Sequence, residues 1–349
     1  MPRGPVTNRP NPYRSRPGIR EVAERAGVGI SSVSRVLSGH SDVSPEMREM
    51  VMAVVDELGY RPNVLAAGLR SQKTMSIGYV VSNISNPVLA HIVTGAESRL
   101  RASGYSLILT NSEGVAALDA SNVSVLLGRR IDGLLLSLSR EDDEATIEAI
   151  RELDVPFVIV DRFPPPGMDA WCITFDHRAG MAAATRHLMD YGHRNIGLII
   201  GGPRRPAVER LSGVEETLHQ HADTVLHTFD GDFSVDHGIA ATRRILSMKP
   251  RPTAIIAGGN MLMQGALRVI YKEGIKLGTE LSLVGCDDVD VADLYEPQIA
   301  IVRRDLRAGG VAAADLLLAA LRDPSGTPQT RTLPTEFIAR ASCGPIPPA

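Results

Sequence analysis

Short apolar runs alternate with longer amphipathic stretches along residues 75–340, and this alternation restricts the fold more than any other feature of the chain. Repeated strand–helix units favour parallel sheets with helices on both faces. Because roughly 260 residues exceed what one such sheet needs, the pattern predicts two doubly wound α/β lobes, whose ligands bind where the carboxyl ends of the strands meet. The predicted strands are Ser76–Val81, Ser106–Thr110, Gly133–Leu136, Phe157–Val160, Ile196–Ile200, Thr253–Ile256 and Ser282–Val284, and the predicted helices include Pro87–Ser103, Arg178–Tyr191, Val208–His221, Met261–Gly274 and Leu306–Leu321.

Residues 18–60 contain three short helical patterns. Gly27 ends the first, the second runs over residues 30–37, and Ser44 caps the third. A Gly-containing turn between two short helices is typical of a helix-turn-helix, which makes this head all-α. The second helix would offer serine hydroxyls, the Arg35 guanidinium and an apolar tip at Ile30 to a DNA major groove. A plain three-helix bundle with solvated serines is the alternative.

The charge of the chain is unevenly distributed. Residues 1–73 carry 11 Lys and Arg against 7 Asp and Glu, a net charge of +4, whereas the rest carries 26 against 33, a net charge of −7. A basic head on an acidic body indicates that the head meets a polyanion. Residues 1–17 are rich in Pro and Arg, which predicts a disordered basic leader that is either solvated or in contact with phosphates.

Two sequence blocks in the head, IREVAERAGVGISSVSRVLSG (19–39) and VSPEMREMVMAVVDELGYRPNVLAAGLR (43–70), resemble the DNA-binding module of the lactose/galactose-repressor family. The resemblance implies that Ile30, Ser31 and Ser34 lie over base edges. It also implies that Arg35 reaches a base or a phosphate, with Ser32 on the same DNA-facing surface. Gly29 and Gly18 depart from the family pattern. The family usually has Ser or Thr at the position of Gly29, and often Thr at the position of Gly18. Both changes weaken the anchoring to phosphates.

Residues 61–74 are predicted to form a hinge helix and linker. Asn63 can cap a segment from Val64 to Arg70, which is too short to hold a helix alone in water. The family resemblance implies that it folds against its copy in the other subunit, in the minor groove. There Leu69 would wedge into a base step, and the small Ala66 would allow close approach. Asn63, Ala66 and Leu69 are therefore predicted DNA-binding residues, and an ordinary linker is the alternative.

The body also resembles this family and, through it, the periplasmic sugar-binding proteins. The pieces that carry the likeness are SNISNP (82–87), RRIDGLLL (129–136), VPFVIVDR (155–162), FDHRAG (175–180), ERLSG (209–213), GDF (231–233), RPTAII (251–256) and LVGCDD (283–288). This implies an effector-binding and dimerisation domain over residues 75–340, followed by a tail, 341–349. The first lobe would span about 75–173 and 303–323 and the second about 174–300 and 327–340, with crossings near 172–176, 298–303 and 322–328.

The cleft between the lobes is the predicted effector site. Carboxylates and guanidinium groups at strand ends suit hydroxyl-rich or anionic ligands. The resemblance implies that the effector contacts are Arg210, Asp287, Asp161, Arg162, Asn260 and Phe233. A surface or inter-lobe salt bridge is the alternative for each charged member. Arg204 and Arg205 would favour an anionic ligand.

These features together predict a sequence-specific DNA-binding transcriptional regulator, a repressor, controlled by a sugar-like effector. We expect a homodimer on a near-palindromic operator, with a tetramer as the alternative assembly. No apolar run reaches membrane length, and no secretion signal begins the chain, so we expect a cytoplasmic protein. The three cysteines form no CxxC pair, and we see no activated nucleophile, so we predict no metal, no cofactor and no enzymatic activity. A solute receptor and an enzyme on the same scaffold are the competing hypotheses.

Overall fold

The computed structural model describes residues 17–60, 73–219, 221 and 223–346. The chain divides into two compact units, the head (Met1–Thr74) and the body (Met75–Ala349). The predicted hinge residues Asn63, Ala66 and Leu69 lie outside the described residues. Among the described residues, no helix has the length and apolar character needed to cross a bilayer.

The head is built from three helices, α1 (Ile19–Ala26), α2 (Ile30–Leu37) and α3 (Pro45–Leu58). Gly27 and Gly59 adopt left-handed backbone angles, which end α1 and α3 at low cost because glycine has no Cβ. The Ser44 side chain accepts a hydrogen bond from the amide of Met47 and caps α3. Val22, Val33 and Val51, one from each helix, are fully buried. The head therefore has the three predicted helices around a small core of its own.

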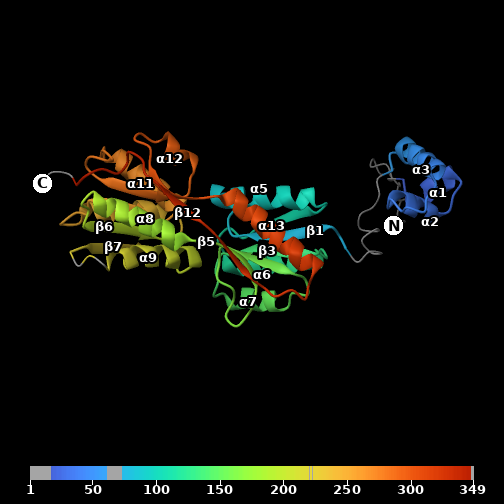
Figure 1. Cartoon of the computed structure of the whole chain (residues 1–349), viewed down its shortest axis with the longest axis horizontal. Helices are drawn as coiled ribbons and strands as arrows, with labels where there is room; N and C mark the ends of the chain where they lie inside the picture. Colours follow the sequence, from blue (N-terminus) through green and yellow to red (C-terminus); the bar gives the residue numbers. More distant parts are fainter. Residues whose placement is uncertain (1–16, 61–72, 220, 222, 347–349) are drawn as a thin grey trace, which may run out of the picture. The chain divides into compact units, whose positions relative to one another are not determined.

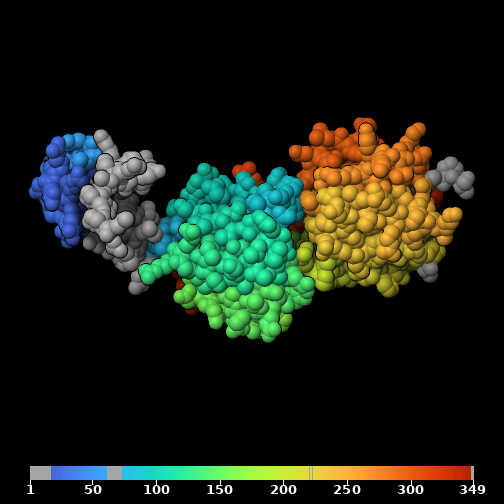
Figure 2. Space-filling view, turned by 180° about the vertical axis from the view of Figure 1, so that it is seen from behind, coloured from blue at the N-terminus to red at the C-terminus, as the bar shows by residue number. Residues whose placement is uncertain are grey.

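The body contains two six-stranded sheets, one for each predicted lobe. The first lobe has the strand order β11-β5-β4-β3-β1-β2, with bounds Thr330–Leu333, Trp171–Phe175, Phe157–Val160, Gly133–Ser137, Ser76–Val81 and Ser106–Asn111. The second has the order β12-β10-β9-β8-β6-β7, with bounds Thr335–Ile338, Ala300–Arg304, Ser282–Cys286, Ala254–Ala257, Asn195–Ile200 and Val225–Asp230. All pairs are parallel except β10 with β12. The two lobes meet along a narrow seam (Figure 2).

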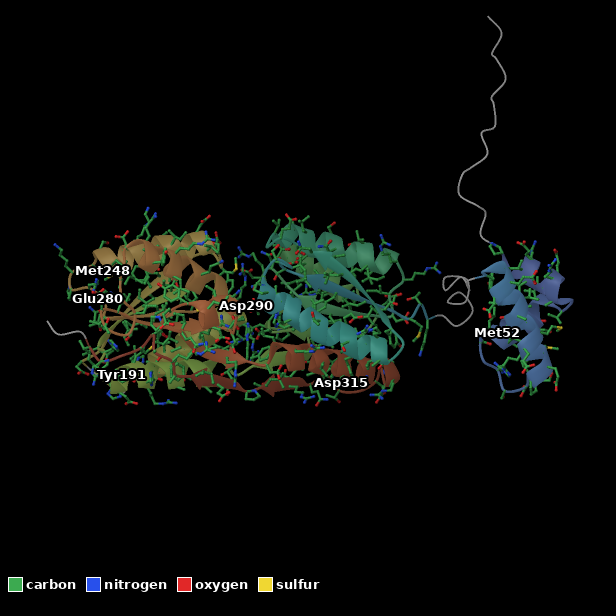
Figure 3. All side chains as sticks on the ribbon, turned by 90° about the horizontal axis from the view of Figure 1, so that it is seen from above. Met52, Tyr191, Met248, Glu280, Asp290 and Asp315 are labelled. Atoms are coloured by element: carbon green, nitrogen blue, oxygen red, sulfur yellow. The ribbon has the colours of Figure 1, made fainter. Side chains whose placement is uncertain are left out.

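Helices cover both faces of each sheet (Figure 1). In the first lobe α5 (Pro87–Ala102) and α13 (Leu306–Arg322) pack on one face, and α6 (Ala116–Gly128) and α7 (Glu144–Arg151) on the other. In the second lobe α8 (His177–Asp190) and α9 (Arg205–Leu218) form one layer, and α10 (Val235–Ser247) and α11 (Asn260–Lys272) the other. The short α12 (Asp290–Leu294) starts at a residue that lies where the lobes meet (Figure 3).

The chain passes between the lobes three times, and the second and third passages differ from the prediction. The second was expected near residues 298–303, but β10 of the second lobe runs to Arg304, so the chain crosses between Arg304 and α13. The third passage differs more. We expected it near residues 322–328, with residues 327–340 in the second lobe. Instead, β11 pairs in parallel with β5 of the first lobe, and the Thr174 and Thr332 hydroxyls are 3.0 Å apart across that pair. Pro334, which has no amide hydrogen to donate, separates β11 from β12 of the second lobe, so the crossing lies there.

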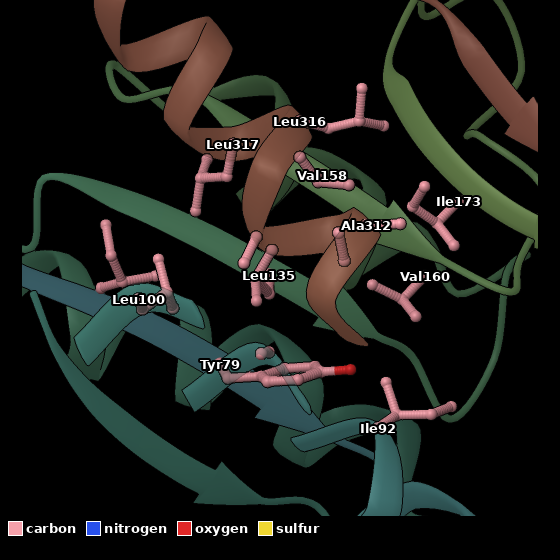
Figure 4. Packing of buried hydrophobic residues seen from close by; sticks show 14 of the residues in the cluster. Tyr79, Ile92, Leu100, Leu135, Val158, Val160, Ile173, Ala312, Leu316 and Leu317 are labelled. Carbon is pink, nitrogen blue, oxygen red and sulfur yellow. The ribbon is translucent and has the colours of Figure 1, made fainter. Parts of the chain in front are cut away.

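Close backbone packing between α5 and α13 completes the core of the first lobe. A Cβ on Gly310 would lie 1.9 Å from the carbonyl oxygen of Ile92, so only glycine permits this approach. Around it, Tyr79, Leu135 and Leu317 fill the space between the helix pair and the sheet (Figure 4). The Tyr79 hydroxyl is 3.0 Å from that of Ser137, which satisfies its buried polar atom. This packing fixes the ends of the central strands, where the functional side chains lie.

Candidate functional site

A cavity of about 410 Å³ lies between the lobes of the body. Residues from both lobes line it, including Ser82 and Asn86 of the first and Gly201 and Gly258 of the second. The cavity is also lined by all six residues that the sequence analysis assigned to the effector, namely Asp161, Arg162, Arg210, Phe233, Asn260 and Asp287. Its volume falls within the range of about 300–1,000 Å³ that is usual for small-molecule sites.

Two buried aspartates lie at the strand ends of this cavity, one in each lobe. Asp161 follows β4 with φ of 55°, and Asp287 follows β9 with φ of 71°. Aspartate tolerates this left-handed conformation better than most residues. Both side chains are almost fully buried, and at that depth a carboxylate needs a positively charged or hydrogen-bonding partner.

Arg304, at the end of β10, supplies that partner to both aspartates. Its Nε donates to Asp287 Oδ1 at 2.7 Å, and its Nη1 donates to Asp161 Oδ2. The guanidinium also lies 4.8 Å from the centre of the Phe175 ring. Arg304 therefore joins a carboxylate of the first lobe to one of the second at the passage from β10 to α13. The sequence analysis missed this residue, although a charged side chain beside a predicted crossing was a usable signal.

The ion pairs of Arg304 keep both aspartates charged. Burial of Asp161 would raise its pKa, but the contacts with His177 and Arg304 outweigh burial and hold the pKa well below its usual value. Burial acts in the same way on Asp287, whose pKa is nevertheless lowered by Arg304 and Arg210. The site therefore contains two negatively charged groups at neutral pH, both of them held by a shared cation.

His177, the first residue of α8, is the second group that the sequence analysis missed. Its Nε2 lies 2.9 Å from Asp161 Oδ1, and its side chain is buried. Burial, reinforced by the charge of Arg210, lowers the pKa of His177 to about 4 although Asp161 opposes the shift. The neutral imidazole therefore donates from Nε2 to the ionised Asp161 at neutral pH.

The buried His177 makes the stability of the body depend on pH. In the unfolded chain the pKa returns to about 6.5, so the unfolded state binds the proton first as the pH falls from about 6.5 towards 4. We expect the free energy of unfolding to fall over this range by up to about 3 kcal/mol from this group. His193, whose pKa burial also lowers, adds to the loss.

Urea denaturation between pH 4 and 7 measures this effect. His177→Gln, which keeps a donor for Asp161, is expected to flatten the pH profile. His219→Gln, at an exposed position where the ring bonds the Glu215 carbonyl, is the matched control and should leave the profile unchanged. An equal slope in wild type and His177→Gln would contradict the assignment.

Two buried acceptors in the cavity have no hydrogen-bond partner among the described residues. They are Asp287 Oδ2 and Asn260 Oδ1. Arg210 Nη2 is 3.8 Å from Asp287 Oδ2, and Arg210 Nη1 donates to the Gly258 carbonyl at 2.7 Å. Orphaned buried acceptors are costly. Hydroxyl groups of a ligand would supply the missing donors.

Phe233 and Arg162 are fixed by their own neighbours. A Cβ on Gly259 would come within 2.1 Å of the Phe233 ring, so glycine there leaves room for the aromatic wall. Arg162 donates from Nε to the Leu138 carbonyl and from Nη1 to the Asp161 carbonyl, both at 2.8 Å. Both side chains are thereby held in the lining of the cavity.

Direct contacts join the lobes beside the cavity. Asn260 Nδ2 donates to Asn86 Oδ1 at 2.9 Å, and the amide of Arg205 donates to Glu141 at 2.9 Å. The Arg205 side chain pairs with Glu209 and lies 5.0 Å from the centre of the Phe163 ring. The structure thus separates the two arginines that we grouped together, because Arg204 lines the cavity and Arg205 takes part in the lobe-to-lobe contact.

In the head, α2 presents a mixed polar surface. Ile30, with 39% of its surface exposed, Ser31 and Arg35 are exposed, whereas Ser32 and Ser34 are half-buried. Val33 and Val36 point into the core. Gly29 occupies the N-cap position of α2 and makes no side-chain cap, as its lack of a hydroxyl requires. The face needed for contact with a major groove is therefore open.

Comparison with known proteins agrees with this description. The model for bacterial regulatory proteins of the lacI family matches residues 18–63, and the model for the periplasmic binding protein-like domain matches residues 185–343. The HTH-type transcriptional repressor PurR of Photobacterium profundum is 30% identical over 93% of this chain and 98% of the relative.

Solved structures give the same result. The lac repressor dimer bound to operator and the anti-inducer ONPF is 29% identical, with a TM-score of 0.84 over 94% of this chain and 99% of the other. A complex of the transcriptional regulator CelR with cellobiose is 32% identical, with a TM-score of 0.69 over 94% of this chain and 100% of the other. These matches confirm the predicted fold class and show a DNA-binding transcriptional repressor rather than an enzyme. The chain belongs to the lacI family of bacterial regulatory proteins.

Proposed function

We propose that this repressor is a homodimer whose two α2 helices read a near-palindromic operator, under the control of a small hydroxyl-rich molecule bound between the lobes. The observation that carries the ligand class is the pair of orphaned acceptors, Asp287 Oδ2 and Asn260 Oδ1, beside the Arg210 guanidinium. Sugar hydroxyls donate to such acceptors and accept from such a cation. The cellobiose complex of a relative supports the same class of ligand.

The DNA side of the proposal rests on α2. Its exposed Ile30, Ser31 and Arg35 match the thymine methyl groups and the donors and acceptors of base edges in a major groove. Two copies, related by a two-fold axis, fit half-sites about one helical turn apart. A pair of such dimers is the alternative assembly. The repressor acts in the cytoplasm, where its operator is, and its affinity for DNA falls steeply with salt.

Ligand and DNA are coupled through the lobes. A ligand that bridges Arg210 and Asp287 of the second lobe to Asp161 and Arg162 of the first favours one arrangement of the two lobes over another. The first lobe begins at β1, directly after the predicted hinge, so its movement changes the spacing of the two hinge anchors. A change in that spacing alters the affinity of the dimer for its operator.

Two measurements test the proposal. A gel shift with the promoter DNA upstream of the encoding gene should give a specific complex at low salt, and a thermal-shift screen of sugars and related metabolites should identify the ligand. Repeating the gel shift with that ligand determines whether it releases the repressor or tightens binding. Failure to bind any duplex at low salt, or equal binding after deletion of residues 1–70, would refute the DNA-binding role.

The hinge makes a separate prediction. We expect Leu69→Ala to weaken operator binding by at least about tenfold, because the wedge that offsets the cost of unstacking a base step is lost. Ligand affinity should stay within about twofold, since residue 69 precedes both lobes in sequence. Titration of operator DNA and of the identified ligand, on the same protein, measures both quantities. Equal losses of the two affinities would show that the segment is not a DNA wedge.

A further inference from the structure

We infer that the natural ligand carries an anionic group beside its hydroxyls, and that Arg162 and Arg204 form the subsite that receives this group. The inference rests on the proposed function, because it concerns the same cavity. It names a narrower class of ligand: a polyhydroxylated anion, such as a sugar carrying a phosphate or a carboxylate. The hydroxyl groups of a neutral sugar would donate to Asp287 Oδ2 and Asn260 Oδ1 but would supply no negative charge to Arg162 and Arg204.

The charges of the cavity do not balance at one end. Four guanidinium groups line the cavity, those of Arg162, Arg204, Arg210 and Arg304. The two buried aspartates are engaged by Arg304, and Arg210 lies beside Asp287. Asp161 and Asp287 thus compensate Arg304 and Arg210. Neither aspartate is left to balance the positive charges of Arg162 and Arg204.

The counter-charge near Arg162 is weak. Its side chain is about nine-tenths buried, and the hydrogen bonds from its Nε and Nη1 go to neutral carbonyl oxygens. Its ion pair is with Glu141, whose Oε1 is 3.9 Å from Arg162 Nε. That same oxygen accepts the amide of Arg205 at 2.9 Å. A distance of 3.9 Å to an oxygen that already accepts another hydrogen bond makes this carboxylate a weak partner for Arg162.

Arg204 has less compensation than Arg162. Its half-buried side chain makes no ion pair within 4.0 Å of a carboxylate in the part of the chain that the structure describes. Burial and the nearby positive charge of Arg162 lower the pKa of Arg204, even though Asp232 and Glu141 oppose the shift. Asp232 and Glu113, the other carboxylates of the lining, are exposed, so water screens their charge. Two guanidiniums on one cavity, whose only ion pair among the described residues is the 3.9 Å contact of Arg162 with Glu141, form a site for a phosphate or carboxylate group.

Inorganic phosphate is the first probe, because it needs no hydroxyl contacts. We expect phosphate, compared with chloride at equal ionic strength, to raise the melting temperature of the wild-type protein more than that of Arg204→Gln. Removing this side chain leaves no carboxylate unpaired, so the variant should fold. Arg151→Gln is the matched control, because Arg151 pairs with Glu148 and both are exposed. Phosphate also stabilises proteins in general, and the control measures that contribution. Equal phosphate shifts in all three proteins would overturn the inference.

Matched ligand pairs then identify the source of the anion. Glucose, glucose 6-phosphate and gluconate, and ribose with ribose 5-phosphate, are titrated by thermal shift into the same three proteins. We expect an anionic member to bind wild type at least about tenfold more tightly than its neutral counterpart, and Arg204→Gln to remove that preference. A panel in which no anionic compound exceeds its neutral partner contradicts the inference. Operator binding, measured on the same preparations, separates this outcome from failure of the proposed function.

Discussion

Replacing Arg304 with methionine is expected to lower the free energy of unfolding of the body by about 3–5 kcal/mol. The side chain of Arg304 is only 7% exposed, and those of Asp161 and Asp287 are 6% and 1% exposed. Methionine fills a similar volume but leaves both carboxylates buried without their shared cation. Two carboxylates that lose their closest cation at that depth cost far more than the contacts of the arginine stem. Urea denaturation at pH 7 measures the change.

Arg303→Met is the matched control, because the neighbouring arginine on β10 pairs with Glu336 at the surface. The two side chains of that pair are 47% and 64% exposed, and such pairs contribute about 0–1 kcal/mol. Adding Asp161→Asn to Arg304→Met should recover part of the loss, because it removes one of the two buried charges that have lost their shared cation. Equal effects of the two single substitutions would mean that Arg304 does not hold the lobes together electrostatically.

The central strands could be predicted from the sequence, whereas of the four edge strands only β2 could. Strands β1, β3, β4, β8 and β9 are buried on both faces, so each appears as a continuous apolar run. In contrast, β7, β11 and β12 are edge strands with polar and exposed residues, and their pairing depends on a neighbour distant in the sequence. Strands β5 and β10 were missed as strands because they coincide with the predicted crossings.

The candidate site shows the same division. Asp161 and Asp287 were predicted because each follows an apolar strand, and a carboxylate at that position points to a ligand or an ion pair. Arg304 was not predicted, because its partners are 143 and 17 residues away along the chain and meet only when the lobes form. The role of His177 likewise depends on its contact with Asp161 across the first crossing. Local sequence patterns identify candidate side chains. Which of these side chains contact one another depends on how the chain crosses between the two lobes.

On the DNA side, we expect Arg35→Ala to reduce the preference of the dimer for its operator over random DNA by about 2–6 kcal/mol, counting about 1–3 kcal/mol for each of the two copies. Arg35 is exposed on α2, beside the core residues Val33 and Val36, so its removal should not disturb the fold of the head. A guanidinium that forks onto a guanine distinguishes base pairs, whereas one that touches only phosphate weakens binding to all sequences alike. Competition gel shifts with operator and random duplexes, over a range of salt concentrations, measure the preference.

Arg25→Ala provides the control for the head, because its guanidinium is held by Glu57 of α3 at 2.5 Å and is exposed on α1. That substitution should leave the preference for operator intact. A uniform loss of affinity in Arg35→Ala, with a smaller salt slope and an unchanged preference, would assign Arg35 to phosphate and leave base reading to Ile30, Ser31 and Ser34. In that case Ser34→Ala should reduce the preference instead. If neither substitution changes the preference, α2 is not the reading helix, because its guanidinium and its central hydroxyl would then both lie away from the base edges.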